Sequence, residues 1–175
     1  MMLWNGSRIT KPTPLMSDIL VLNSSPEAFE TIVHARGLES FRFLRSTSVH
    51  EIREWLTTDG NKAWLILFDD LGLQDIGTQS WLEWLAQQHP QMKMGFLVAY
   101  GQERFAQQLY EGSAVNFYVQ QPFSPCLIAS EILACLEDKP SLSVMLNEIL
   151  KMAIDANSTP VAEYIANIKR TFTTR

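Results

Sequence analysis

Short apolar runs alternate with amphipathic stretches through the middle of this chain, and that alternation constrains its fold more than any other feature. The apolar runs cover residues 19–22, 41–44, 64–68, 94–99 and 115–119. Each run has the length of a strand, and each is followed by a stretch whose apolar residues recur at helical spacing. Five such units in succession predict a doubly wound α/β domain, in which helices cover both faces of a five-stranded parallel sheet.

Capping residues mark where several of the predicted helices begin. Ser24 with Glu27, and Ser48 with Glu51, fit the capping box, in which a serine caps the helix and an acidic residue three positions on completes the motif. Ser124 stands directly before a proline, which suits the first turn of a helix. We therefore expect helices to begin at these three places, and the last of them to run to about residue 136.

The composition excludes several classes of function. Hydrophobic residues make up 46% of the chain, enough for a core, and the net charge is −5 with scattered basic residues. This leaves no broad basic face for nucleic acid. No apolar run reaches the roughly 20 residues of a membrane helix, and residues 1–15 lack the apolar segment of a signal peptide. We expect a cytoplasmic protein without nucleic-acid or membrane partners, in which 1–16 is a disordered arm or a non-native start.

The cysteine, histidine and tryptophan residues do not indicate a metal or cofactor. Cys126 and Cys135 lie about two and a half turns apart in one predicted helix, too far for a disulfide within it, and we interpret both as buried apolar residues. The histidines, expected on solvated helix surfaces, are His34, His50 and His89. The tryptophans on apolar faces, expected in the core or at an interface, are Trp55, Trp64, Trp81 and Trp84.

Polar residues follow most of the predicted strands. The strand ends hold Asn23-Ser24, Asp69-Asp70, Ala99-Tyr100 and Gln120-Gln121. In a parallel α/β sheet the functional groups gather at the carboxyl ends of the strands, so we expect these residues to share one site. Neither a glycine-rich dinucleotide motif nor a Walker motif is present, which argues against the usual kinds of nucleotide binding.

The order of these landmarks resembles the receiver domain of bacterial response regulators. Asn23 and Ser24 stand where receivers place an acidic pair, and Asp69 stands where they place the phosphoacceptor aspartate. Ala99 takes the place of the switch threonine or serine. The segment 118–123 matches the aromatic-x-x-Lys-Pro-Phe signature except that Gln121 replaces the lysine. The resemblance covers residues 17–138 and implies a flavodoxin-like sheet with the strand order 2-1-3-4-5.

The resemblance implies a phosphorylation pocket that has lost most of its chemistry. A receiver binds Mg²⁺ through the acidic pair and the phosphoacceptor, and its lysine neutralises the phosphoryl charge. Here the corresponding side chains of Asn23, Ser24 and Gln121 are neutral, and that of Ala99 cannot form a hydrogen bond. The carboxylates that remain are those of Asp69, the candidate phosphoacceptor if there is one, and Asp70. We expect no enzymatic activity, bound metal or cofactor.

The resemblance also identifies a residue at which receivers change between two states. Tyr118 stands where receivers carry the aromatic residue that moves between two states. Without the threonine, this ring is expected to be locked or to respond to a partner. Asp69 also has a purely structural interpretation, because a carboxylate at a strand end is stabilised by the dipoles of nearby helix N-termini.

Residues 139–175 are predicted to form two further short helices. The first begins at Ser141 and carries the apolar stripe Leu142, Met145, Leu146, Ile149, Leu150 and Ala153. The second follows Pro160, carries Val161, Tyr164, Ile165 and Ile168, and ends near Arg170. Two short amphipathic helices must bury their stripes on the domain, on each other or on a second copy. Receivers often dimerise through helix four, strand five and helix five, so we predict a homodimer that uses this extension.

Three functions fit these observations. The first is a phosphorylation-independent signalling or regulatory module that binds a protein partner through a receiver-like scaffold. The second is an atypical response regulator that is still phosphorylated on Asp69. The third is a small-ligand sensor that uses the uncharged pocket at the strand ends.

Overall fold

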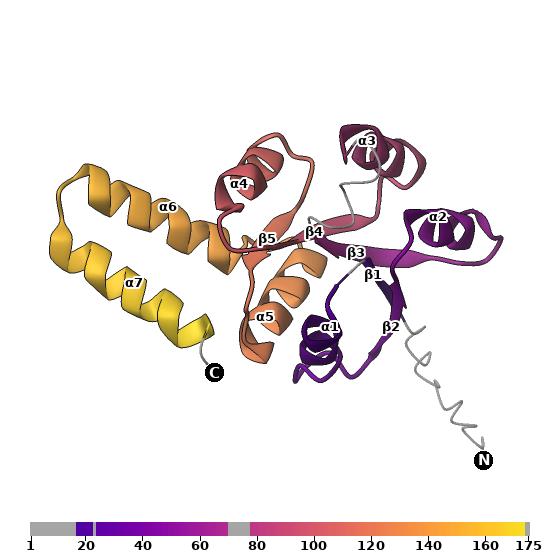
Figure 1. Ribbon diagram of the computed structural model, residues 1–175, viewed down its shortest axis with the longest axis horizontal. Coiled ribbons are helices and arrows are strands. Elements are labelled where there is room, and N and C mark those ends of the chain that lie inside the picture. The colour runs from indigo at the N-terminus through magenta and orange to yellow at the C-terminus, as the bar shows by residue number, and fades with distance from the viewer. Residues whose placement is uncertain (1–16, 23, 70–77, 174–175) are drawn as a thin grey trace, which may run out of the picture.

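The computed structural model describes residues 17–22, 24–69 and 78–173, and in them it confirms the predicted alternation of strands and helices (Figure 1). The five parallel strands are β1 Ser17–Leu22, β2 Phe41–Ser46, β3 Ala63–Asp69, β4 Lys93–Val98 and β5 Phe117–Gln120. They pair in the order β2-β1-β3-β4-β5, as the resemblance implied. The predicted arm at 1–16 and two predicted site residues, Asn23 and Asp70, lie outside the described residues.

Helices cover both faces of this sheet. They are α1 Pro26–Val33, α2 Val49–Thr57, α3 Thr78–Gln88, α4 Glu103–Glu111, α5 Pro125–Leu136, α6 Leu142–Asp155 and α7 Thr159–Thr173. Side chains of β3 alternate between two cores: Ile66 and Phe68 pack with α2, α3 and α4, whereas Leu65 and Leu67 pack with α1 and α5. All four are fully buried, so β3 is the central strand that its apolar sequence predicted.

The first helix begins one residue later than its capping pattern predicted. Ser25, not Ser24, is the N-cap of α1, and its Oγ accepts a hydrogen bond from the backbone N–H of Ala28 over 3.1 Å. The reason is Pro26, which occupies the first helical position, where its missing N–H costs no hydrogen bond. Ser24 is thereby left outside the helix and is buried.

The other capping serines stand where the sequence placed them. Ser48 caps α2 by accepting a hydrogen bond from the backbone N–H of Glu51. The carboxylate of Glu51 does not return to Ser48 but accepts a 2.5 Å hydrogen bond from the hydroxyl of Ser46. Ser124 caps α5 by accepting from the N–H of Leu127 over 3.2 Å. These caps fix where the chain turns from strand ends into helices.

An ion pair at the opposite end of the sheet fixes the pairing of β1 with β2. Asp18 and Arg42 are partners in the parallel register, and Asp18 is only 5% exposed. Its carboxylate accepts hydrogen bonds from Nε and Nη2 of Arg42 over 2.6 and 2.5 Å. The hydrogen bonds that Arg42 donates to Asp18 raise the pKa of the Arg42 guanidinium. This two-pronged contact favours one register of the edge strand.

One prediction of burial is wrong and another is narrowed. Trp64, expected in the core or at an interface, is not in the core: it is 58% exposed, because it lies near the start of β3, before the stretch at which the strand becomes buried. Cys126 is exposed in the first turn of α5, whereas Cys135 is buried as predicted, and both thiols are free. His34 and His50 are exposed as expected.

The other three tryptophans predicted on apolar faces, and His89, differ in how far they are buried. Trp81 is buried, and Trp55 and Trp84 are half-buried. The guanidinium carbon of Arg53 lies 4.4 Å from the ring centroid of Trp84, which also packs edge-on against the half-buried ring of His89. Trp84 therefore joins α2 to α3 at the surface and is not enclosed in the core.

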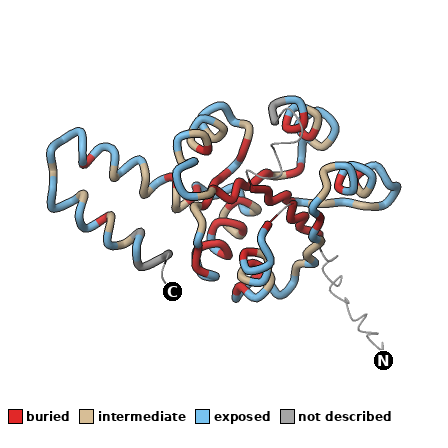
Figure 2. The backbone as a smooth tube through the Cα atoms, in the orientation of Figure 1, coloured by how far each residue is buried: buried red, intermediate tan, exposed pale blue. Residues whose placement is uncertain are grey.

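Helices α6 and α7 form an antiparallel hairpin that projects from the β5 side of the domain (Figure 1). The first part of α6 packs on the domain, where Val144 is 5% exposed and joins the core that contains Tyr118, and α7 also contacts α5. Most of the hairpin is exposed (Figure 2). Helix α7 runs to Thr173, three residues past the predicted end. No helix in the described ranges is long and apolar enough to cross a membrane.

Candidate functional site

The carboxyl ends of the strands surround an open pocket of about 760 Å³. Four predicted site residues line it: Ser24 after β1, Asp69 at the end of β3, Ala99 after β4 and Gln121 after β5. The expectation that the strand-end residues share one site is therefore met for these four and for Tyr100, whereas Gln120 does not line the pocket. Tyr118, also predicted, does not line this pocket.

Asp69 is a buried carboxylate at the last position of β3. It is 4% exposed and pairs in register with Leu97 of β4. Among the described residues that line the pocket, the other carboxylate is that of Glu27, which is exposed on α1. The two acidic groups thus come from different elements, a buried one at the end of β3 and an exposed one on α1.

Gln121 is a neutral group tied to the backbone of β4. Its Nε2 donates to the carbonyl oxygen of Leu97 over 3.3 Å, and its backbone N–H donates to that of Val98 over 2.8 Å. The neighbouring Gln120 donates instead to the carboxylate of Glu103 on α4 over 2.7 Å. The end of β5 therefore supplies amide donors to the site and no positive charge.

The residue after β4 is Ala99, whose side chain cannot form a hydrogen bond with a ligand. Ala99 is half-buried and presents a methyl group, while its carbonyl oxygen accepts a hydrogen bond from the N–H of Gln102. Tyr100, which follows, is 88% exposed. No side-chain hydroxyl from residue 99 can therefore contact a group held beside Asp69.

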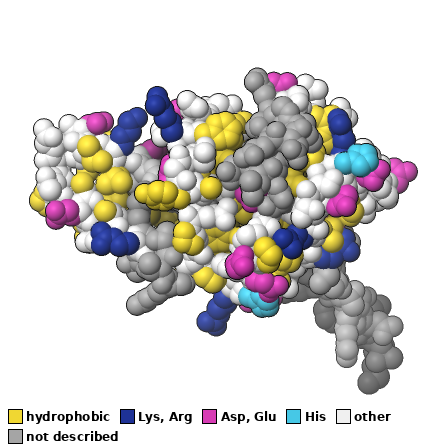
Figure 3. Space-filling model, viewed as in Figure 1, with side chains coloured by type: hydrophobic (Ala, Val, Ile, Leu, Met, Phe, Trp, Pro, Cys, Tyr) yellow, Lys and Arg dark blue, Asp and Glu magenta, His cyan; other side chains and the backbone are white. Residues whose placement is uncertain are grey.

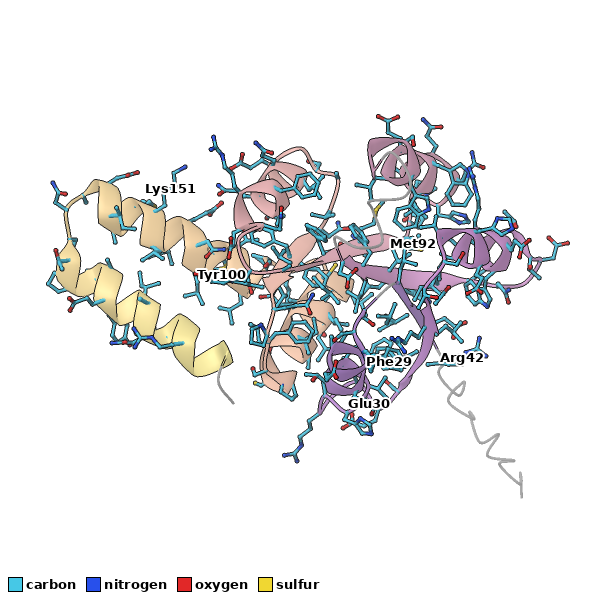
Figure 4. The ribbon with its side chains drawn as sticks, viewed as in Figure 1. Phe29, Glu30, Arg42, Met92, Tyr100 and Lys151 are labelled. Atoms are coloured by element: carbon cyan, nitrogen blue, oxygen red, sulfur yellow. The ribbon has the colours of Figure 1, made fainter. Side chains whose placement is uncertain are left out.

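The pocket lining carries a positive charge that the sequence patterns did not indicate, and it belongs to Arg45 of β2. Its Nη2 donates to the carbonyl oxygen of Ser24 over 2.8 Å, and its guanidinium carbon lies 5.6 Å from the ring centroid of Phe29. Phe29 lies on the side of α1 toward β2 (Figure 4). The missed signal was that Arg45, too, stands near the carboxyl end of a strand.

Ser24 contributes a second feature that the sequence did not reveal. Ser24 is 3% exposed, and its Oγ has no hydrogen-bond partner among the described residues. Buried hydroxyls are nearly always hydrogen-bonded, so such a group in a pocket wall marks a place where a ligand oxygen could bind.

Tyr118, the predicted switch aromatic, is held by the C-terminal extension. The residue is 6% exposed, and its hydroxyl oxygen accepts a 3.0 Å hydrogen bond from Nδ2 of Asn147 on α6. Its ring packs against that of Tyr110 on α4, with centroids 6.1 Å apart. Burial raises the pKa of Tyr118, and the hydrogen bond from Asn147 opposes that rise. In this structure the ring faces α6, away from the pocket.

A buried glutamate fastens α6 to α5. Glu131 is fully buried in α5, and its Oε1 accepts a 2.6 Å hydrogen bond from the backbone N–H of Ser143 in the first turn of α6. Ser141 caps the same turn by accepting from the N–H of Val144. A carboxylate at a helix N-terminus is stabilised by the helix dipole, so this contact positions the hairpin on the domain.

The described residues contain no group of three or more histidine, cysteine, aspartate or glutamate side chains that could hold a metal ion.

No protein-family model matches the sequence, and no curated protein matches it either.

Solved structures of receiver domains share the architecture. A response regulator from Thermotoga maritima has a TM-score of 0.58 and 16% identity, over 70% of this chain and 99% of that one. Together with the strand order 2-1-3-4-5, this likeness decides the fold. The chain has the receiver fold.

Two further structures with the receiver fold support the same conclusion. A receiver domain protein from Methanospirillum hungatei has a TM-score of 0.57 and 18% identity, covering 71% of this chain and 96% of its own. A receiver domain protein from Clostridium thermocellum has a TM-score of 0.55 and 16% identity, covering 70% of this chain and 93% of its own. At such low identity the likeness establishes the fold alone.

Proposed function

We propose that this chain is a receiver-like signalling module that acts without phosphorylation and binds a protein partner. The observation that carries the proposal is the composition of the strand-end pocket, where Ser24, Ala99 and Gln121 accompany Asp69. A phosphoryl group on Asp69 would gain neither a lysine charge from residue 121 nor a hydroxyl hydrogen bond from residue 99. Both contacts stabilise a phosphorylated state by binding its oxygens.

The pocket is also a poor place for the Mg²⁺ that such chemistry requires. Magnesium prefers octahedral coordination by oxygens, usually with carboxylates supplied from more than one neighbouring segment. In the described lining these carboxylates are Asp69 and the exposed Glu27 on α1. Ser24 stands on the segment that would supply the acidic pair, and its hydroxyl carries no charge.

The α6–α7 hairpin is the proposed interaction surface. Of the eight large hydrophobic residues exposed in the described chain, six lie on this hairpin, which points to α6 and α7 and not to the sheet domain. Met145, Ile149 and Met152 are 44%, 44% and 70% exposed and lie at helical spacing on one face of α6. Hydrophobic side chains also gather over the hairpin on the face shown in Figure 3.

A second copy of the chain is the proposed occupant of the Met145–Ile149–Met152 face. Two antiparallel helices that pair with their copies make a four-helix bundle, which buries apolar stripes that a single hairpin leaves in water. The homodimer would not use a bare α4–β5–α5 surface, because α6 already packs against β5 and α5. A protein partner would then bind the assembled dimer.

The proposal treats residues 17–138 as the receiver-like domain and 139–175 as the extension that gives the chain its specificity. It places the protein in the bacterial cytoplasm, in signalling of the two-component type, and it assigns no catalytic residue. The support for these points is the receiver fold and the sequence features that accompany it.

Beryllofluoride with Mg²⁺ tests the proposal, since it mimics a phosphoryl group on an aspartate. In two-dimensional amide NMR spectra of the full chain, we expect the signals of Ser24, Ala99 and Gln121 to stay in place. Shifts of these signals that Asp69→Asn abolishes would contradict the proposal and would favour the atypical phosphorylated regulator. Asp59→Asn, which changes an exposed aspartate after α2, is the matched control.

A further inference from the structure

We propose that the strand-end pocket binds a small zwitterion, with its carboxylate on Arg45 and its ammonium on Asp69. Both side chains line the same pocket of about 760 Å³, which is within the usual size range of small-molecule sites. This inference goes beyond the proposed partner-binding role and does not rest on it.

The guanidinium of Arg45 is held in place by contacts that leave it able to bind a carboxylate. Its guanidinium is held on one side by the carbonyl oxygen of Ser24 and lies against the ring of Phe29. A guanidinium has five N–H donors in a planar fork, so the contact through Nη2 leaves others for a carboxylate. Because the side chain is already anchored, less conformational freedom is lost when the ligand binds.

The hydroxyl of Ser24 gives independent support for an oxygen-bearing ligand at this end. Ser24 is 3% exposed, lines the pocket and has no hydrogen-bond partner for its Oγ among the described residues. A ligand carboxylate on Arg45 would give this hydroxyl an acceptor. The N-terminus of α1, capped by Ser25 at the same wall, adds the favourable end of a helix dipole.

The same lining also carries a negative charge. Asp69 is buried at the end of β3, and the lining includes the apolar side chains of Ala99, Pro122 and Phe123. A carboxylate in such surroundings favours a cationic group, and the apolar walls suit the methylene groups that join the two charges.

The combination of charges selects between ligand classes. A simple anion would be attracted by Arg45 but repelled by Asp69 and Glu27, and a simple cation would be repelled by Arg45. A ligand with one ammonium and one carboxylate satisfies both sides. We therefore expect amino acids, of either the α or the ω type, in preference to phosphate, fatty acids or amines.

Isothermal titration of the full chain with amino acids tests the inference. The probes are leucine and the ω-amino acids from glycine to 6-aminohexanoate, and the controls with charge of one sign only are hexanoate, hexylamine and inorganic phosphate. We expect at least one zwitterion to bind roughly tenfold or more tightly than every one of these controls. The inference is overturned if no zwitterion binds, or if one of these controls binds as tightly as the best zwitterion.

Substitutions of Arg45 and Asp69 test whether the zwitterion binds in this pocket. Arg45→Gln and Asp69→Asn should each weaken binding of the best zwitterion by roughly tenfold or more, because each removes one charged partner. Arg45→Lys, which keeps the charge but not the fork, should lose less, and it replaces Arg45→Gln if that variant fails to fold. Arg104→Gln removes an exposed charge on α4 and should leave affinity unchanged. Unchanged affinity in the Arg45 variants would contradict the assignment.

Discussion

The carboxamide of Asn147 on α6 donates a 3.0 Å hydrogen bond to the hydroxyl oxygen of Tyr118 on β5. The two residues lie 29 positions apart, and their contact joins the C-terminal extension to the ring that the receiver resemblance marks as a switch. Because Tyr118 is 6% exposed and also packs on Tyr110, its position depends on the placement of α6. The extension is thus part of the structure around this ring.

A double-mutant cycle tests this coupling. Asn147→Ala and Tyr118→Phe should each lower the free energy of unfolding by about 1 kcal/mol, because each removes one partner of a part-buried hydrogen bond. The double variant should lose less than the sum of the two. Urea unfolding provides the measurement. Fully additive losses would show that the hydrogen bond does not couple the residues, and Glu148→Gln, on the exposed neighbour of Asn147, is the control.

Glu131 should control how firmly α6 is attached. Glu131→Ala removes the carboxylate that accepts from the N–H of Ser143, and should cost about 1–3 kcal/mol of stability. Hydrogen exchange should accelerate in the first turn of α6 and stay unchanged in α1. Glu131→Gln, which keeps an acceptor oxygen, should show a smaller effect. Equal exchange in α6 of the alanine variant and the parent protein would contradict the role of this contact.

The buried thiol of Cys135 should make stability depend on alkaline pH. Burial is the main cause that raises its pKa from 9.0 to about 11. Since the folded-state pKa is the higher one, the unfolded chain loses this proton first as pH rises. The free energy of unfolding should therefore fall through the window from 9 to 11, by about 2–3 kcal/mol.

Cysteine variants isolate this effect in urea unfolding below, within and above that window. Cys135→Ala should flatten the alkaline decline, although its stability at neutral pH is lower because packing is lost. Cys126→Ala, on the exposed cysteine of the same helix, should keep the full decline. A decline of the same size in both variants would show that Cys135 is not its cause.

The oligomeric state tests the use of the hairpin. We expect light scattering to report a dimer, and the Met145→Glu/Met152→Glu double variant to be a folded monomer, because charges would then enter the paired apolar face. Gln87→Glu adds a similar charge on the exposed surface of α3 and should leave the dimer intact. A monomer for the parent protein at high concentration would refute the homodimer.

Sequence patterns predicted the fold because local rules decide most of it. The apolar runs, Ser48 and Ser124 gave strands and helix starts that the structure confirms. An error arose where a neighbour changes the outcome, because Pro26 moves the cap to Ser25. Trp64 is not in the core because it lies outside the buried stretch of its strand, which leaves an interface as its predicted place.

The candidate site was less predictable than the fold. Strand order brought Asp69 and Gln121 together as expected, since parallel strand ends must converge. Arg45 could not be predicted as a site residue, because an arginine on a half-polar edge strand has the same sequence pattern as an ordinary surface residue. The partners of Tyr118 and Glu131 lie on α6, and such contacts depend on how the hairpin packs, which no local pattern in the sequence specifies.

Intact-mass measurement after incubation with acetyl phosphate and Mg²⁺ tests most directly whether this receiver fold acts without phosphorylation. The account predicts that the mass of the full chain stays unchanged. A gain of one phosphoryl group that is lost in Asp69→Asn, and retained in the control Asp59→Asn, would contradict it.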